Sequence, residues 1–145
     1  MSPLPAKPPP VDAETQPFWD ATKEGRLCLP RCRKCDFVIF YPRSRCPRCR
    51  SHETDWTDLS GLGEIYSCTV VRRAPGRWKE HVPYVVAYVQ LAEGPRLVTN
   101  IVGCDPEDVT IGMPVRVRFE PAGDEGYALP RFEPCLPAGQ PTPAV

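Results

Sequence analysis

Four cysteines are the residues of this chain best suited to do chemistry. They form two Cys-x-x-Cys pairs, Cys32/Cys35 and Cys46/Cys49, with ten residues between the pairs. A two-residue spacer lets both thiolates of one tight turn reach the same ion, and two such turns facing each other supply a tetrahedral four-sulfur site. The spacing predicts a zinc ribbon, in which a structural Zn²⁺ closes a hairpin too small to have a core of its own.

The same four sulfurs also suit other chemistry. A one-iron redox centre has the same geometry and is the main rival, and disulfides or a redox dithiol are further alternatives. The remaining cysteines, Cys28, Cys68, Cys104 and Cys135, lack the spacing of a disulfide framework. This favours a protein of a reducing compartment over a secreted disulfide scaffold.

We recognise no known catalytic motif in the sequence. Its two histidines are His52 and His81, and His52 follows Cys49 by three residues. His52 could replace a cysteine at the metal, but four cysteines already fill the shell, which leaves no open position for a water or substrate. We find no Gly-rich phosphate loop, nucleophile elbow or paired acidic motif. We therefore predict no catalytic residues and no enzyme activity for the chain alone.

Charge is balanced overall but unevenly distributed. The chain has 18 Lys and Arg against 18 Asp and Glu, which argues against a protein that binds nucleic acid or anionic membranes by bulk charge. Residues 26–50 hold eight cations and one acid, giving +7, so the rest of the neutral chain sums to −7. Four thiolates with one divalent ion leave the ribbon near +5. This surface either keeps a small module soluble or attracts an acidic or phosphorylated partner.

The elements that must position the cysteines lie at the N-terminal side. Residues 1–11 contain five prolines and predict a disordered lead. Residues 12–59 predict a short helix and the ribbon. Asp12 or Thr15 is the expected N-cap of that helix, Pro17 lies in its first turn and Gly25 ends it. Residues 27–29 and the β-prone run 37–41 predict ribbon strands, and residues 51–59 a polar connection.

Residues 60–135 predict a small β-barrel. Expected strands cover 63–73, 83–91, 96–103, 115–120 and 127–132, with an interruption between the third and the fourth. Pro130 restricts the fifth strand to an edge or a bulge. This order is typical of an OB-fold, although an SH3-like barrel or an open meander has a similar pattern. The predicted fold is mainly β: a helix and rubredoxin-like zinc ribbon, then a five-stranded OB-fold barrel, then a Pro-rich tail over 136–145.

Three features of the sequence lack an internal packing partner: the short helix, the outer face of the second barrel strand, and the loop before that strand. The candidate partner-binding residues are Phe18, Trp19, Arg77, Trp78, Lys79, Tyr84 and Tyr88. Alternatively, Trp19 and Tyr84 pack the ribbon onto the barrel within one chain. The cationic, aromatic loop also suits stacking on a base or nucleotide.

Several motifs together resemble one known family. They are Pro17-Phe18-Trp19, Leu29-Pro30-Arg31-Cys32, Tyr41-Pro42-Arg43, Cys46-Pro47-Arg48-Cys49, Gly94-Pro95-Arg96-Leu97-Val98 and Ile111-Gly112-Met113-Pro114-Val115. The chain resembles, from about residue 13 to 134, the acyl-CoA-associated zinc-ribbon and OB-fold family, long called domain of unknown function thirty-five. In that family the four ribbon cysteines bind zinc.

The resemblance implies a non-catalytic accessory subunit. Family members dock on and stabilise a thiolase-superfamily enzyme, such as a thiolase or a retro-aldolase that shortens steroid side chains. A hetero-oligomer around a thiolase-like dimer is implied, with the CoA thioester bound jointly with the partner. A nucleic-acid-binding module is the alternative, disfavoured because the barrel is acidic and its strands lack an exposed aromatic ladder. A rubredoxin-like electron carrier is the third class.

The N-terminus MSPLPAKPPPV lacks the apolar core of a signal peptide. No run in the sequence approaches the ~18 apolar residues of a membrane span. We therefore expect a soluble cytoplasmic protein without a membrane partner.

Overall fold

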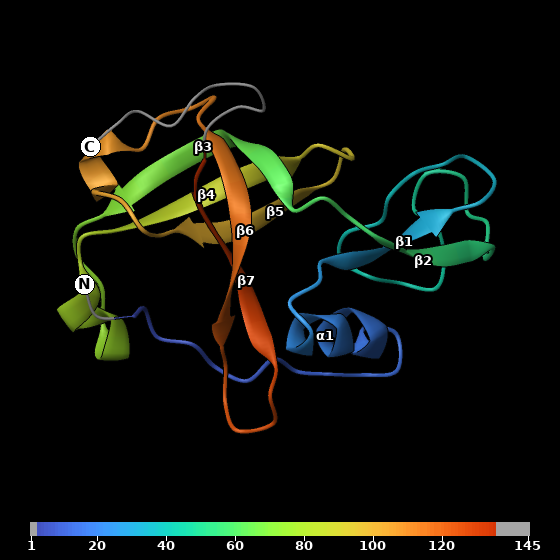
Figure 1. Cartoon of the computed structure of the whole chain (residues 1–145), viewed down its shortest axis with the longest axis horizontal. Helices are drawn as coiled ribbons and strands as arrows, with labels where there is room; N and C mark the ends of the chain where they lie inside the picture. Colours follow the sequence, from blue (N-terminus) through green and yellow to red (C-terminus); the bar gives the residue numbers. More distant parts are fainter. Residues whose placement is uncertain (1–2, 136–145) are drawn as a thin grey trace.

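A computed structural model describes residues 3–135. The elements in order are α1 (Gln16–Lys23), β1 (Cys28–Cys32), β2 (Thr54–Asp58), β3 (Leu62–Val71), the 3₁₀ helix η1 (Gly76–His81), β4 (Tyr84–Leu91), β5 (Arg96–Ile101), the 3₁₀ helix η2 (Pro106–Asp108), β6 (Pro114–Pro121) and β7 (Ala128–Pro134). Figure 1 shows the ribbon at one end of the molecule, the barrel at the other and α1 below their junction. The predicted tail, residues 136–145, lies outside the described residues. Within residues 3–135, none of the helices has the length and apolar character needed to cross a bilayer.

Helix α1 occupies the C-terminal part of the predicted range 12–24. A turn precedes it, in which the Oδ1 atom of Asp12 accepts hydrogen bonds from the backbone N–H and the hydroxyl of Thr15, both at 2.9 Å. The helix ends at Lys23, and Gly25 provides the predicted stop: it adopts φ +69°, and its N–H donates to the carbonyl of Thr22. Eight residues are too few for a stable isolated helix, so tertiary packing must hold it.

The ribbon sheet differs from the sequence expectation. β1 pairs antiparallel with β2, from Cys28 opposite Asp58 to Cys32 opposite Thr54. The interpretation of 51–59 as a polar connection was wrong, and the expected strand at 37–41 is reduced to one bridge between Arg31 and Val38. β2 has no buried face, so its sequence lacks the apolar alternation that predicts a strand. Main-chain pairing with β1 defines it instead.

The barrel confirms the OB-fold expectation. All five predicted strands are present, and they close in the order β3-β4-β5-β7-β6. β5 and β7 run parallel and pair only at Ile101 and Phe132, so the closure is narrow there. Pro130 lies inside this closed barrel rather than on a free edge. It is tolerated because β7 has almost no ladder on its β5 side, where the Thr99 hydroxyl donates to the Pro130 carbonyl at 2.9 Å instead.

A single apolar core joins the helix, the ribbon and the barrel. It includes Phe18 of α1, Leu29 of β1 and Phe132 of β7, each at most 1% exposed. The alternating side chains predicted for the inner face of the second barrel strand are all buried: Val85, Ala87, Val89 and Leu91. A second, small cluster surrounds the cysteines and includes the buried Ile39. The ribbon and the barrel therefore pack together as one body.

The Pro-rich lead differs from the predicted disorder. Residues 3–11 run as an extended segment beside the barrel, from the neighbourhood of η1 to α1 (Figure 1). The guanidinium of Arg131 donates to the carbonyls of Leu4 at 3.0 Å and Pro5 at 2.6 Å. Arg131 is only 3% exposed, so it needs such acceptors, and the lead supplies them.

Candidate metal centre and binding groove

The structure brings the four predicted ligands together. Their Sγ atoms all lie within 4.8 Å of one another, with 3.5 Å between Cys32 and Cys49 and 3.6 Å between Cys35 and Cys46. Four bonds of about 2.3 Å in a tetrahedron place sulfurs about 3.8 Å apart, whereas a disulfide needs about 2.05 Å. The arrangement fits a structural zinc ion in a closed shell, and all four cysteines are free of disulfides.

The two knuckles share one backbone conformation. Asp36 and Arg50 each follow the second cysteine of a pair, and their N–H groups donate at 2.9 Å to the carbonyls of Cys32 and Cys46. Both residues have positive φ, 62° for Asp36 and 67° for Arg50. This left-handed region disfavours side chains other than glycine. The chain therefore accepts backbone strain at both turns to direct the sulfurs inward.

Hydrogen bonding prepares part of the shell for ionisation. Burial opposes the ionisation of Cys46, but the backbone N–H groups of Cys49 and Arg48 donate to its sulfur and lower its pKa to about 7. The N–H of Phe37 donates to Cys35, but burial and the neighbouring sulfurs outweigh this and raise that pKa to about 12. Metal ligation requires thiolates, so the lowered pKa of Cys46 favours metal binding at that sulfur.

The ribbon is less basic than residues 26–50 suggest. β2 brings two carboxylates against its arginines, with Arg33 2.5 Å from Asp55 and Arg26 2.5 Å from Asp58. These pairs are exposed, so they add little stability, but they neutralise charge locally. Any steering of an anionic partner by the ribbon is correspondingly weaker.

Two of the predicted partner contacts are internal. Phe18 is 1% exposed and Trp19 is 7% exposed, so neither offers a surface to a partner. The Phe18 ring meets the rings of Trp19 and Tyr41 edge to face, and Trp19 Nε1–H donates to the Tyr41 hydroxyl at 2.8 Å. The prediction for Phe18 and Trp19 is corrected accordingly: both pack the ribbon onto the barrel.

The other predicted contacts reach the surface. Arg77 and Lys79 are exposed on η1, and Trp78 between them is half-buried, with its ring centroid 4.7 Å from that of Tyr84. Tyr88 is 38% exposed on the outer face of β4. Their role in partner binding stays a prediction.

Sequence reasoning missed part of an exposed patch on the outer face of β3, β4 and β5. Tyr66 and Val98 are 49% and 63% exposed, and the Tyr66 ring lies 6.4 Å from that of Tyr88. Arg96 stacks 3.8 Å above the Tyr66 ring. We call Tyr66, Tyr88, Arg96 and Val98 the tyrosine patch. A bulge between residues 65 and 67 displaces Tyr66 from simple alternation, which hid the patch in the sequence.

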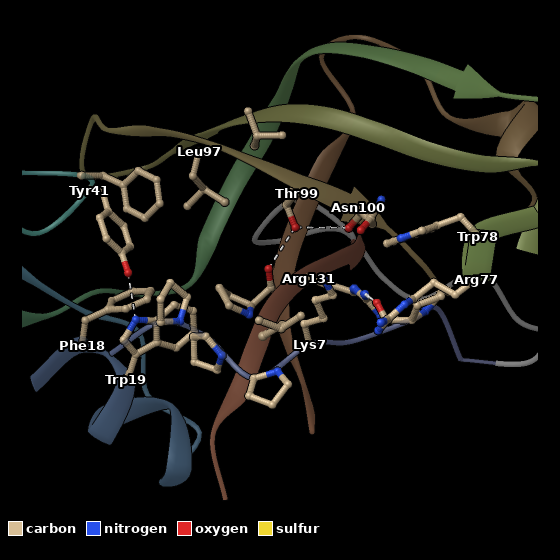
Figure 2. A pocket seen from close by; sticks show the side chains of 18 of the residues that line it. Lys7, Phe18, Trp19, Tyr41, Arg77, Trp78, Leu97, Thr99, Asn100 and Arg131 are labelled. Carbon is tan, nitrogen blue, oxygen red and sulfur yellow. Dashed lines mark hydrogen bonds between the residues drawn. The ribbon is translucent and has the colours of Figure 1, made fainter. Parts of the chain in front are cut away.

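Sequence reasoning also missed a groove of about 770 Å³. Its walls come from the Pro-rich lead, the ribbon residues Phe40 and Tyr41, η1, β5 and β7. Figure 2 shows Phe18, Trp19 and Tyr41 at one end, Arg77 and Trp78 at the other, and Lys7 of the lead between them. The lead was interpreted as disordered, so no signal pointed to Lys7. The available hint was Arg131 in β7, an arginine that lies between Pro130 and Phe132 in the sequence.

The fold and the cysteine cluster define a zinc-ribbon protein with an attached OB-fold barrel. Residues 19–55 match a family model described as "ChsH2, rubredoxin-like zinc ribbon domain". Residues 56–120 match "ChsH2, C-terminal OB-fold domain". The chain belongs to this family, also known as DUF35. A "DUF35 domain-containing scaffold protein" of Methanocaldococcus jannaschii is 43% identical, over 74% of this chain and 80% of that protein.

Other relatives carry enzyme-subunit names. A "Probable enoyl-CoA hydratase alpha subunit" of Thermomonospora curvata is 40% identical over 94% of this chain. The chain spans only 43% of that relative's length. A "Benzoylsuccinyl-CoA thiolase subunit BbsA" of Thauera aromatica is 30% identical, over 74% of this chain and 81% of that protein.

Among solved structures, a chain of "Ltp2-ChsH2(DUF35) aldolase" matches with a TM-score of 0.76 and 38% identity. The match covers 88% of this chain and 98% of that one. A DUF35-family protein of unknown function from Sulfolobus solfataricus, at 15% identity and a TM-score of 0.63, shares the fold.

Proposed function

We propose that this chain is a non-catalytic accessory subunit that docks on and stabilises a thiolase-superfamily enzyme acting on acyl-CoA thioesters, and helps shape its CoA site. The observation that carries the proposal is the match to nearly the whole of one chain of an aldolase assembly at 38% identity. The relative named as a thiolase subunit supports the same partner class. The relatives named scaffold proteins support a non-catalytic role.

The metal in this proposal is structural zinc. Four sulfurs fill a tetrahedral shell, so the ion has no position for substrate, and its binding energy holds the ribbon together. Iron in the same shell would make the chain an electron carrier. The absorption spectrum of the protein as isolated separates the two, because zinc tetrathiolate is colourless and the ferric site is red.

The tyrosine patch and the exposed residues of η1 are the proposed docking surface. Tyrosine and arginine are the usual anchors of protein interfaces, and the patch combines two exposed tyrosine rings with Arg96 and the apolar Val98. Trp78 and Tyr84 extend this aromatic surface towards η1.

Co-purification tests the proposal. The chain is co-expressed with the products of its neighbouring genes, and we expect a thiolase-superfamily enzyme to remain bound and to turn over an acyl-CoA thioester. The isolated chain should show no turnover. Turnover by the chain alone that one point mutation in this chain abolishes would refute the accessory role.

A matched pair of variants tests the docking surface. Tyr88→Ser removes an anchor of the patch and should weaken the complex by about tenfold or more. Ile111→Ser, at a residue 70% exposed outside the patch, should leave affinity within about twofold. Equal affinities of the two variants would show that the partner docks elsewhere.

Single-stranded nucleic acid is the second candidate ligand, favoured by the tyrosine patch. Exposed aromatic rings beside an arginine form a stacking platform of the kind OB-folds use for bases. An oligonucleotide-binding assay separates the candidates. Tight binding that falls steeply with salt and is lost in Tyr88→Ser would support the nucleic-acid function over the accessory role.

A further inference from the structure

The groove is continuous in shape but differs in chemistry along its length. One end is lined by aromatic rings that include Trp19, Phe40 and Tyr41. The other end is formed by η1, where Arg77 and Trp78 line the wall (Figure 2). Its volume, about 770 Å³, is within the range of small-molecule sites, roughly 300–1,000 Å³. The groove therefore suits one extended ligand with an apolar part and a polar part.

The polar end selects for negative charge. Lys7, Arg77 and Arg131 line the groove, and none of the described lining residues is acidic. Arg131 is buried and already paired with Glu120, so Lys7 and Arg77 are the exposed cations among the described lining residues. Asn100 adds an amide on β5, although its Nδ2 donates to the Val85 carbonyl at 2.9 Å. Exposed cations without opposing carboxylates favour a phosphate group over a neutral ligand.

A flat ring is the second feature that this end can hold. Trp78 lies against Tyr84, with ring centroids 4.7 Å apart, and Trp78 lines the groove. The ring is thus held in place on one side and available to the groove on the other. A positioned indole is a stacking surface for a base, as in single-stranded nucleic-acid sites. In OB-folds, the loop between the first two barrel strands often binds ligands, and η1 lies in that loop.

The Pro-rich lead is part of the wall rather than a cover beside it. Pro5, Lys7 and the three prolines 8–10 line the groove. Arg131 holds the start of the lead through the carbonyls of Leu4 and Pro5. Pro8 packs on the loop between β6 and β7 at Gly123, where a Cβ would lie 2.5 Å from the Pro8 Cγ. Prolines pay little conformational entropy when ordered, which suits a fixed wall.

We propose that this groove binds a phosphorylated nucleotide, with the base on Trp78, the phosphates between Lys7 and Arg77, and the Pro-rich lead as a required part of the site. The choice of CoA as the nucleotide rests on the proposed function. Its phosphorylated adenosine lies at the η1 end, and its pantetheine arm runs along the prolines towards the aromatic rings of the ribbon.

Nucleotide binding is measured by calorimetry on the isolated, zinc-loaded full chain, with CoA, its adenosine bisphosphate fragment, and adenosine. We expect both phosphorylated ligands to bind, adenosine to bind at least tenfold more weakly, and affinity to fall as salt rises. Lys7→Ala and Arg77→Ala should each weaken binding about 5–10-fold. Arg73→Ala is the matched control, an exposed arginine in the same connection that does not line the groove, and should bind like the wild type.

Two glycines of one loop test the role of the lead. Gly123→Ala and Gly126→Ala both place a side chain at positive φ, +77° and +84°, so they share the backbone strain. At Gly126 the new Cβ would meet only the Lys23 side chain, at 4.0 Å, whereas at Gly123 it would displace Pro8. Only Gly123→Ala should weaken nucleotide binding, by the same 5–10-fold as Lys7→Ala.

Each outcome decides one point. No binding at millimolar ligand, or wild-type affinity in both Lys7→Ala and Arg77→Ala, overturns the site. Wild-type affinity in Gly123→Ala overturns the role of the lead. Because these measurements need no partner, loss of nucleotide binding with an intact enzyme complex refutes the groove alone. Nucleotide binding without any complex refutes the proposed function alone.

Discussion

Replacing Phe18 by alanine should strongly destabilise the whole chain. Phe18 is 1% exposed, and its ring meets three others edge to face: Trp19 at 4.8 Å, Tyr41 at 6.0 Å and Phe40 at 6.3 Å. These rings belong to α1 and the ribbon, which are held by separate contacts, so they cannot collapse fully into the space left behind. Buried Phe→Ala changes cost about 3–5 kcal/mol, and we expect about 4 kcal/mol here.

Guanidinium unfolding measures the free energy of unfolding that Phe18→Ala loses. The free zinc concentration is held fixed, because metal binding contributes to apparent stability. At about 3 °C per kcal/mol, Tm should fall by roughly 12 °C. Trp56→Ala on β2 is the control: Trp56 is 39% exposed, and its loss should cost about 1 kcal/mol or less. A loss for Phe18→Ala no larger than that of the control would refute the internal role of Phe18 and return it to the candidate partner contacts.

Three further predictions concern the ribbon and the helix. Cys46→Ser should abolish stoichiometric zinc binding and leave the ribbon unfolded, as metal analysis and circular dichroism would show. A stable, soluble apo-protein that keeps its partner would contradict this prediction. Arg50→Val should be less stable than Arg50→Gly by about 1–2 kcal/mol, because φ is +67° at this exposed position; equal denaturation midpoints would show that the turn is not strained. The side-chain hydrogen bond from Thr15 lowers the pKa of Asp12 in the folded protein. The resulting stabilisation is present above the pKa of this carboxyl in the unfolded chain, about 4, and is lost as pH falls through its lower pKa in the folded protein. Asp12→Asn should remove that part of the acid dependence, as pH-dependent thermal melts of both proteins would show.

Short-range signals predicted the metal centre and most strands. The Cys-x-x-Cys spacing identifies the ligands because one turn brings both sulfurs to the same side. The fold then brings the two turns together. The alternation from Val85 to Leu91 identifies the inner face of β4, because side chains of a strand alternate between its faces. Gly25 identifies the end of α1 through its positive φ.

Long-range pairing could not be predicted from such signals. β2 has exposed or half-buried side chains throughout, and only its backbone bonds to β1 make it a strand. The adjacent aromatic residues Phe18 and Trp19 looked like surface anchors because a short helix shows no internal partner. Their partners, Phe40 and Tyr41, lie more than 20 residues away in the chain.

The sequence by itself determined the ligand set of the metal centre, the family and the positions of the barrel strands along the chain, because each is encoded by residues within one turn, one strand or one motif. The tertiary structure alone decided what is buried and where a ligand can bind. Arg131 and Leu4 are 127 residues apart in sequence, yet their hydrogen bond orders the lead and forms a groove wall. Contacts of that separation leave no periodicity in the sequence, since they depend on how the closed barrel places β7 beside the N-terminus.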